Sequence, residues 1–260
     1  MLRLFFKYLN YKIFNGNRRG HGIHSPFVFS FIQQVLINTK EDAQLTRIHE
    51  WHKNLRKRNL PVGKVSFGAG TKCTRIFSSG RSDHAGRIGP SFKYGKLLYK
   101  LVRFSSPRQI IELGTGAGIS LGYLAMADPD LEVISVEGCP ERSAFAEENI
   151  KTLGLKNITL ICSSFDDFLR DHPRIRKPFL IYIDGNHSYL PTLKYFKYFC
   201  SLADENSIIV IDDIHWSKEM EQAWEEIKTS PHVRISIDLF FTGILFFRKS
   251  IAKQDFIIDF

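Results

Sequence analysis

The chain has 260 residues, of which 43% are hydrophobic and 24% are charged, and its formal net charge is +9. This composition is typical of a globular protein long enough for a sizeable core. Its four cysteines are widely spaced without a CxxC pair, which argues against a zinc site and a disulfide scaffold and favours a reducing cytoplasm.

The first predicted element is a helix over residues 2–14, with a polar stripe at Arg3, Lys7 and Asn10. Because lysines interrupt its apolar run and no small-residue cleavage site follows, we do not expect a signal peptide. The sequence contains no run of 18 apolar residues, so no transmembrane helix is expected. The helix pattern fits packing on the domain or on a partner subunit, and it also fits contact with a membrane surface.

Residues 1–104 are predicted to form a mainly helical, loop-rich, basic N-terminal region. They contain 20 Lys and Arg against 4 Asp and Glu, whereas the remainder contains 16 against 23. Such asymmetry suggests a region that faces an acidic substrate, nucleic acid or a membrane, although a solvated basic face would have the same composition. Further helices are predicted at 27–38, 41–58 and 91–104.

Long loops rich in Gly, Ser, Arg and His join these helices, and such loops often form lids or binding segments. One of them contains a glycine cluster at 65–72. We interpret it as a loop that closes over the site, with Lys72 and Arg75 facing substrate. A plain surface turn is the alternative.

From residue 105 the pattern becomes regular. Apolar, strand-like runs at 109–113, 132–137, 157–162, 179–184 and 207–212 alternate with helix-like stretches, among them 140–153 and 216–229. This alternation predicts βαβ units and a parallel sheet. The segment near the C-terminus instead predicts an antiparallel hairpin with its turn at Thr242–Gly243.

The stretch "IIELGTGAGIS", residues 110–120, predicts a strand, a tight turn and the start of a helix. A dinucleotide fingerprint is excluded because the sixth position from either of its first two glycines is apolar. No Lys-Ser/Thr pair follows, which excludes a P-loop. The remaining pattern is acid-x-G-x-G-x-G, formed by Glu112, Gly114, Gly116 and Gly118.

That pattern resembles motif I of the class I S-adenosylmethionine-dependent methyltransferases, over about residues 105–249. The resemblance implies an α/β fold with a Rossmann-like, mostly parallel seven-stranded sheet and an antiparallel C-terminal hairpin strand, in a domain over 105–260. It implies that the glycine backbone approaches S-adenosylmethionine. Glu137, at the end of the second strand, is expected to bind the ribose hydroxyls. Ser164 and Phe165, after the third strand, are implied to flank the adenine.

Two further strands end in a carboxylate followed by a histidine. The run at 179–184 ends in Asp184 with His187 three residues later, and the run at 207–212 leads into Asp212, Asp213 and His215. Ligands in open α/β sheets bind outside the carboxyl ends of the strands, so these carboxylates are expected to converge near the methyl group. A divalent cation with oxygen ligands, such as Mg²⁺, would relieve their repulsion.

This arrangement looks like that of the cation-dependent O-methyltransferases of the catechol, caffeoyl-CoA and macrocin types. The resemblance implies that Asp184, Asp212 and Asp213 bind the metal. In the catechol type a lysine three residues after the first aspartate is the general base; here His187 has that position, with Asp184 as a second catalytic residue. Four alternatives stay open: Asp184 caps the next helix, Asp212 binds the cofactor's amino group, His187 is structural, or His215 merely starts a helix.

The expected activity is methyl transfer to a hydroxyl of a small molecule or sugar with cation assistance. The expected partners are an anionic or glycosidic acceptor and a second copy of the chain. A nucleic-acid methyltransferase is the second hypothesis, although the fourth strand ends in Asp-Gly-Asn-His and not in an Asn-Pro-Pro-aromatic motif. A methyltransferase fold that only binds its ligand is the third, because a fold does not determine a function.

Overall fold

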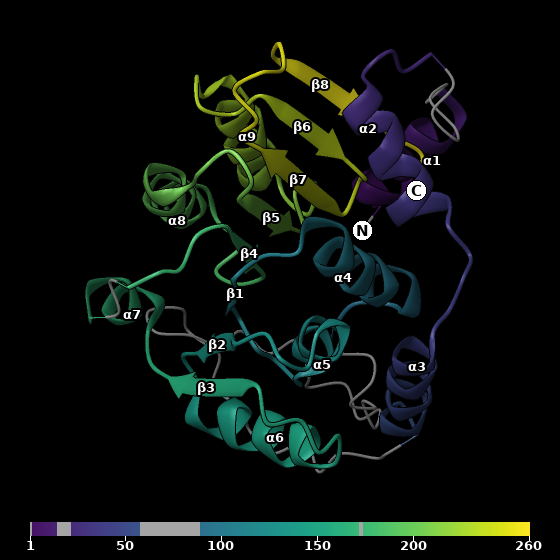
Figure 1. The fold of residues 1–260 in the computed structure, drawn as a ribbon. Coiled ribbons are helices and arrows are strands. Elements are labelled where there is room, and N and C mark those ends of the chain that lie inside the picture. The colour runs from purple at the N-terminus through teal and green to yellow at the C-terminus, as the bar shows by residue number, and fades with distance from the viewer. Residues whose placement is uncertain (1, 15–21, 58–88, 172–173) are drawn as a thin grey trace. The chain divides into compact units, whose positions relative to one another are not determined.

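The computed structural model of the chain describes residues 2–14, 22–57, 89–171 and 174–260 (Figure 1). The chain divides into two compact units. We call residues 40–103 with 108–175 the central unit, and residues 1–39, 104–107 and 176–260 the terminal unit. Each unit takes segments from both sides of residue 104, so the domain boundary expected there stays a prediction. The glycine cluster at 65–72, with Lys72 and Arg75, lies outside the described residues.

The central unit contains a parallel arrangement of three strands in the order β3-β2-β1. The strands are β1 Gln109–Leu113, β2 Val133–Glu137 and β3 Ile158–Cys162. Its helices are α3 Ala43–Leu55, α4 Phe92–Ser105, α5 Ile119–Ala127, α6 Pro140–Lys151 and α7 Phe165–Asp171. Every residue of β1 and of α5 is buried, which explains why both segments are mostly apolar instead of amphipathic, with Gln109, Glu112 and Ser120 as buried polar exceptions.

The terminal unit contains five strands in the order β4-β5-β7-β6-β8. They are β4 Phe179–Ile183, β5 Ile208–Asp212, β6 Ile235–Asp238, β7 Thr242–Phe246 and β8 Gln254–Ile257. Strand β7 is antiparallel to both of its neighbours, whereas β4 with β5 and β6 with β8 are parallel pairs. The helices are α1 Leu2–Phe14, α2 Pro26–Phe31, the π-helical η2 Ile32–Ile37, α8 Tyr189–Leu202 and α9 Lys218–Thr229.

The predicted fold class is confirmed: strands and helices alternate, most strand pairs are parallel, and the C-terminal hairpin is antiparallel. The described residues form eight strands where seven were expected, because Gln254–Ile257 adds β8 beside β6. The helix predicted at 27–38 is found as α2 followed by η2. In the part of the chain that the structure describes, no helix is both long and apolar enough to cross a membrane.

The hairpin turn predicted at Thr242–Gly243 is wrong, because both residues belong to β7. The chain turns at residues 239–241, where Phe240 adopts a φ of +72° and its amide donates to Asp238 Oδ1 at 2.7 Å. Gly243 is needed for packing inside the strand, since a Cβ there would lie 2.6 Å from the ring of the buried Trp224. Glycine therefore marks close contact with a helix at this position and not a turn.

Candidate functional site

Three glycines shape the turn between β1 and α5. Gly114, Gly116 and Gly118 all have positive φ, at +106°, +55° and +81°. Glycine adopts such backbone without the steric cost of a Cβ. A Cβ at Gly116 would meet no heavy atom within 4 Å, so the backbone of Gly116 borders open space. The turn therefore offers main chain that a ligand can approach closely.

The carboxylate of Glu137, at the end of β2, is tied to this turn. Its Oε2 accepts a hydrogen bond from the amide of Gly116 at 3.0 Å, and its Oε1 accepts one from the amide of Cys139 at 3.0 Å. The Arg142 guanidinium lies 3.8 Å from Oε2. Each carboxylate oxygen can accept more than one hydrogen bond. Glu137 therefore retains acceptor capacity for vicinal hydroxyls while its position is held by the backbone.

Glu112 lies inside β1, with its side chain fully buried. The hydroxyl of Ser135 donates to Glu112 Oε2 at 2.5 Å, and that hydroxyl also lies 2.6 Å from the hydroxyl of Thr115. Burial raises the pKa of Glu112 to about 7, and hydrogen bonds from serine hydroxyls oppose the rise. Glu112 thus supports the glycine turn from the interior through Ser135 and Thr115.

Ser164 and Phe165 follow β3, where the adenine contact was expected. The Ser164 hydroxyl accepts from the amide of Asp167 at 3.1 Å and donates to the Asp167 carboxylate at 2.6 Å. This is the capping geometry of a helix N-terminus, here that of α7. Phe165 is the first residue of that helix and is half-buried. Ser164 therefore has a structural role, and the adenine contact stays a prediction.

A second cluster lies at the carboxyl ends of β4 and β5 in the terminal unit. The Nε2 atom of His187 lies 3.6 Å from Asp184 Oδ1 and 3.9 Å from Asp213 Oδ2. One imidazole nitrogen is therefore within ion-pair distance of carboxylates from two neighbouring strands. Helix α8, which follows, has Ser188 as its N-cap, so the alternative that Asp184 caps this helix is wrong.

Asp212 is directed toward β7, where the Thr242 hydroxyl donates to its Oδ1 at 2.6 Å. Burial raises the pKa of Asp212. Burial, together with the charge of Asp212, raises the pKa of Asp213 to about 7. Burial lowers the pKa of His187, and the charge of Asp212 opposes this effect. In all three groups burial disfavours the charged form, and only for Asp213 does a neighbouring carboxylate add to the shift.

The oxygen donors of these aspartates are of the kind that a hard divalent cation prefers. Among the described residues, however, no group of three or more His, Cys, Asp or Glu side chains is arranged to hold a metal ion. His187 approaches two of the three carboxylates that a cation would share, those of Asp184 and Asp213. The metal site at Asp184, Asp212 and Asp213 therefore stays a prediction. The oxygen donors of these residues suit a divalent cation.

The sequence did not reveal the role of His215. Its Nε2 lies 2.8 Å from Asp238 Oδ2, and its Nδ1 lies 3.2 Å from the ammonium of Lys7 in α1. Because an ammonium only donates, Nδ1 accepts and Nε2 carries the proton that is donated to Asp238. His215 thus links α1 to the loop that begins at Asp213. The polar stripe of α1 was the only sequence signal, and its partner lies 208 residues away.

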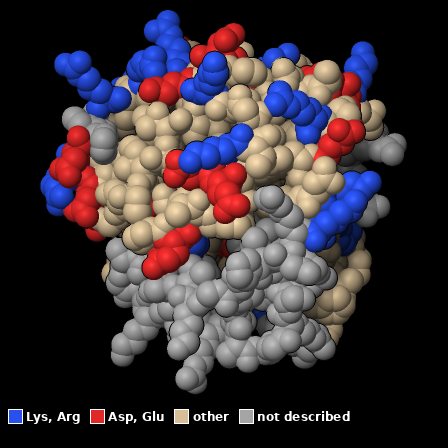
Figure 2. Space-filling view, turned by 90° about the horizontal axis from the view of Figure 1, so that it is seen from below, with Lys and Arg blue, Asp and Glu red and all other residues tan. Residues whose placement is uncertain are grey.

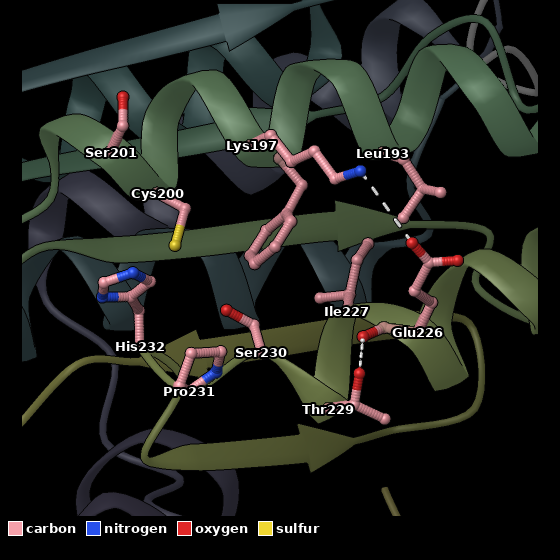
Figure 3. A pocket seen from close by; sticks show the side chains of 11 residues that line it. Leu193, Lys197, Cys200, Ser201, Glu226, Ile227, Thr229, Ser230, Pro231 and His232 are labelled. Carbon is pink, nitrogen blue, oxygen red and sulfur yellow. Dashed lines mark hydrogen bonds and ion pairs between the residues drawn. The ribbon is translucent and has the colours of Figure 1, made fainter.

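A pocket of about 370 Å³ lies between the C-terminal halves of α8 and α9 (Figure 3). Cys200 and His232 lie on its wall, and Lys197 Nζ lies 3.9 Å from Glu226 Oε1 beside it. None of the predicted site residues lines this pocket. The candidate site is consequently assigned from the chemistry of the strand ends and not from the size of a pocket.

Comparison with known proteins finds similarity to methyltransferases. The sequence profile of a methyltransferase domain matches residues 111–214, from β1 to the loop after β5. Catechol O-methyltransferase of Niastella koreensis is 31% identical over 134 residues, which cover 49% of this chain and 58% of that protein. Ribosomal RNA small subunit methyltransferase G of Acidothermus cellulolyticus is 42% identical over 53 residues, which cover 20% of this chain and 24% of that protein.

Among solved structures, the O-methyltransferase TomG from Streptomyces achromogenes, in complex with S-adenosylmethionine, superimposes with a TM-score of 0.53. The two are 21% identical, and the match covers 85% of this chain and 96% of that one. This likeness shows the fold. The chain spans less than two thirds of the length of the two curated relatives described above.

The burial of Glu112 leads to a prediction about how the stability of the chain depends on pH. Its pKa of about 7 in the folded chain lies above its ordinary value of 4.5, so the folded state binds more protons between these pH values. Stability contributed by the protonated group is therefore lost as pH rises from 4.5 toward 7. Glutamine does not titrate, so Glu112→Gln does not lose this stability. The melting temperature of the variant minus that of the parent chain should therefore be about 5 °C larger at pH 8 than at pH 5.

The measurement is thermal unfolding of the cofactor-free chain at both pH values. Glu225→Gln is the control, because the Glu225 side chain is 68% exposed on α9. A difference between Glu112→Gln and the parent that stays constant with pH would contradict the prediction.

Proposed function

We propose that this chain, which contains a class I S-adenosylmethionine-dependent methyltransferase domain, transfers a methyl group to a hydroxyl of a small molecule or sugar. The observation that carries the proposal is the approach of His187 to Asp184 and Asp213 at the ends of β4 and β5. A base beside carboxylates suits the deprotonation of a hydroxyl.

The central unit supplies the groups that would hold S-adenosylmethionine. The turn at Gly114, Gly116 and Gly118 would receive the amino-acid part of the cofactor, because its backbone borders open space. Glu137 would accept hydrogen bonds from the ribose hydroxyls, and Ser164 with Phe165 would lie at the adenine. When bound, the cofactor supplies an electrophilic methyl group on its sulfonium.

His187 is the proposed general base. Burial lowers its pKa, so the imidazole is neutral and able to accept a proton near pH 7. We assign the proton taken from the acceptor hydroxyl to Nε2, because this is the ring atom at the carboxylate cluster. The imidazolium formed in this way would be stabilised by Asp184 and Asp213, and the deprotonated acceptor oxygen would attack the methyl group.

A divalent cation held by Asp184, Asp212 and Asp213 is the second element of the proposal. Its support is that three carboxylates follow two paired strands and offer oxygen donors, and that burial raises the pKa of Asp212 and, together with the charge of Asp212, that of Asp213. When bound, such a cation lowers the pKa of a hydroxyl that it coordinates.

Nucleic acid is the second candidate acceptor. It is favoured by the basic composition of residues 1–104 and by the partial similarity to ribosomal RNA methyltransferase G. Among the described residues on the face seen in Figure 2, however, Lys and Arg side chains are interspersed with Asp and Glu side chains. RNA binding that falls steeply with salt would favour this alternative, because phosphate contacts release counterions.

Cofactor binding at the glycine turn is tested with Gly116→Val. Binding of S-adenosylmethionine, which we expect at ~1–100 μM in the parent chain, should be lost, because the branched side chain would enter the open space beside Gly116. Isothermal titration calorimetry measures this. Gly154→Val is the matched control, because Gly154 has a similar φ of +65° but lies after α6. Equal affinities in both variants would remove the claim.

The cation is tested with Asp184→Asn, which removes a charge and retains the shape of the side chain. Mn²⁺ affinity, followed by electron paramagnetic resonance, should fall by about 10–100-fold, while S-adenosylmethionine affinity is unchanged. The exposed Asp130, changed to Asn, provides the control. Parent protein that binds no Mn²⁺, or that retains full methyl transfer after EDTA treatment, would show that the cation is not used.

The base is tested with His187→Ala, after an acceptor has been found by screening catechols and glycosides with methyl-labelled cofactor. Turnover should fall by ~10²–10⁴-fold and recover in part with added imidazole. The loss should shrink at high pH, where the acceptor ionises without a base. His232→Ala, in the pocket of Figure 3, should retain full turnover. Parent-like turnover of His187→Ala would assign the histidine a structural role.

A further inference from the structure

Helix α1 exposes a continuous apolar face. Phe5 and Phe6 are each 58% exposed, Leu9 is 36% exposed and Ile13 is 69% exposed. Residues 5, 9 and 13 follow one another at intervals of four and therefore lie along one side of the helix, with Phe6 beside them. Large apolar side chains gathered on one exposed face mark an interaction surface more often than scattered ones do.

The opposite face of α1 attaches the helix to its own unit, and it does so with polar and aromatic groups. Lys7 contacts Glu221 at 2.8 Å as well as His215, and Lys12 pairs with Asp259. Tyr8 packs edge-on against Phe240, with ring centroids 5.0 Å apart. An ordinary surface helix buries its apolar side and exposes its polar side. In α1 two phenylalanines, a leucine and an isoleucine are exposed instead, so the packing of the unit does not account for the apolar face.

The charge around this face indicates what covers it. The first 40 residues contain six Lys and Arg and no Asp or Glu. At 100° per residue, Lys12 borders the apolar face on the side of Phe5, and Arg3 borders it on the side of Phe6. Lys12 is paired with Asp259 and Arg3 with Glu221, and the Arg3 side chain stays 47% exposed. Phenylalanine and leucine between basic flanks are typical of helices that lie in the interface of an anionic bilayer.

The length of α1 determines how it would lie. Its 13 residues span about 20 Å, whereas the hydrocarbon core of a bilayer is about 30 Å thick. We propose that α1 is an interfacial helix that binds the surface of membranes containing anionic lipids, with Phe5, Phe6, Leu9 and Ile13 inserted at the headgroup boundary. The contacts with Glu221, His215 and Asp259 hold the helix so that this face is presented before binding.

The experiment is co-sedimentation of the full chain with sucrose-loaded vesicles of phosphatidylcholine, with and without phosphatidylserine, at low and high salt. The chain should bind the anionic vesicles at least ~10-fold more tightly than the neutral ones, and high salt should weaken this binding. The double variant Phe5→Ser/Phe6→Ser should bind at least ~10-fold more weakly, because two aromatic side chains no longer insert. Leu190→Ser is the control and should bind normally, since Leu190 is 73% exposed on α8, which lies apart from α1 in Figure 1.

Three outcomes would overturn the proposal: no binding to either vesicle, equal binding to both at low salt, or unchanged binding of the double variant. Light scattering across a concentration series tests the alternative occupant. A dimer that the double variant abolishes, without vesicle binding by the parent, would assign the face to a contact between copies. Circular dichroism and S-adenosylmethionine affinity verify that the double variant is folded. None of these measurements depends on methyl transfer.

Discussion

A carboxylate buried at the end of a strand requires compensation, and this requirement organises both units. A charge removed from water is costly unless hydrogen bonds or an opposite charge replace the lost hydration. In the central unit the compensation comes mainly from the protein itself. Glu137 accepts hydrogen bonds from two backbone amides, and one of these amides belongs to the glycine turn. The acid thereby fixes the turn, and the turn in return orients the acid for a ligand.

The acids of the terminal unit are compensated differently. Asp212 receives the Thr242 hydroxyl, whereas Asp184 and Asp213 share the approach of a single imidazole nitrogen. Burial is the main cause of the raised pKa of Asp213 and of the lowered pKa of His187, and the charge of Asp212 adds to the first shift and opposes the second. Shifts of this kind accumulate where a protein uses its ionisable groups for chemistry. The contrast separates a cluster suited to holding a ligand from one suited to moving a proton.

The N-terminal helix connects to this chemistry through a polar contact. Lys7 donates a hydrogen bond to His215. His215 belongs to the loop that begins at Asp213, a residue with a φ of +55°. The amide of Ile214 in the same loop donates to the carbonyl of Phe241 at 3.1 Å. The loop is thus held from α1 and from the β6–β7 turn together. This attachment occupies the polar side of α1 and leaves its apolar side exposed.

Local chemistry in the sequence determined much of the fold. The apolar runs identified β1 to β5 to within a residue or so. For β1, β2, β4 and β5 the reason is that a buried parallel strand needs apolar side chains on both faces. Glycine spacing identified the turn after β1, and acids that follow apolar runs identified the strand ends. Each of these signals lies within a few residues along the chain, where sequence alone is informative.

Only the tertiary structure decided the features that depend on distant partners. Gly243 lies in a strand because Trp224 packs over it. The turn forms at Phe240, where Asp238 accepts a hydrogen bond from the Phe240 amide. Ser164 caps a helix, although its position also suits a ligand contact. The amphipathic pattern of α1 indicated a helix but not which side is buried. That side is selected by Glu221, His215 and Asp259, more than 200 residues away, because long-range contacts leave no periodic signal in the local sequence.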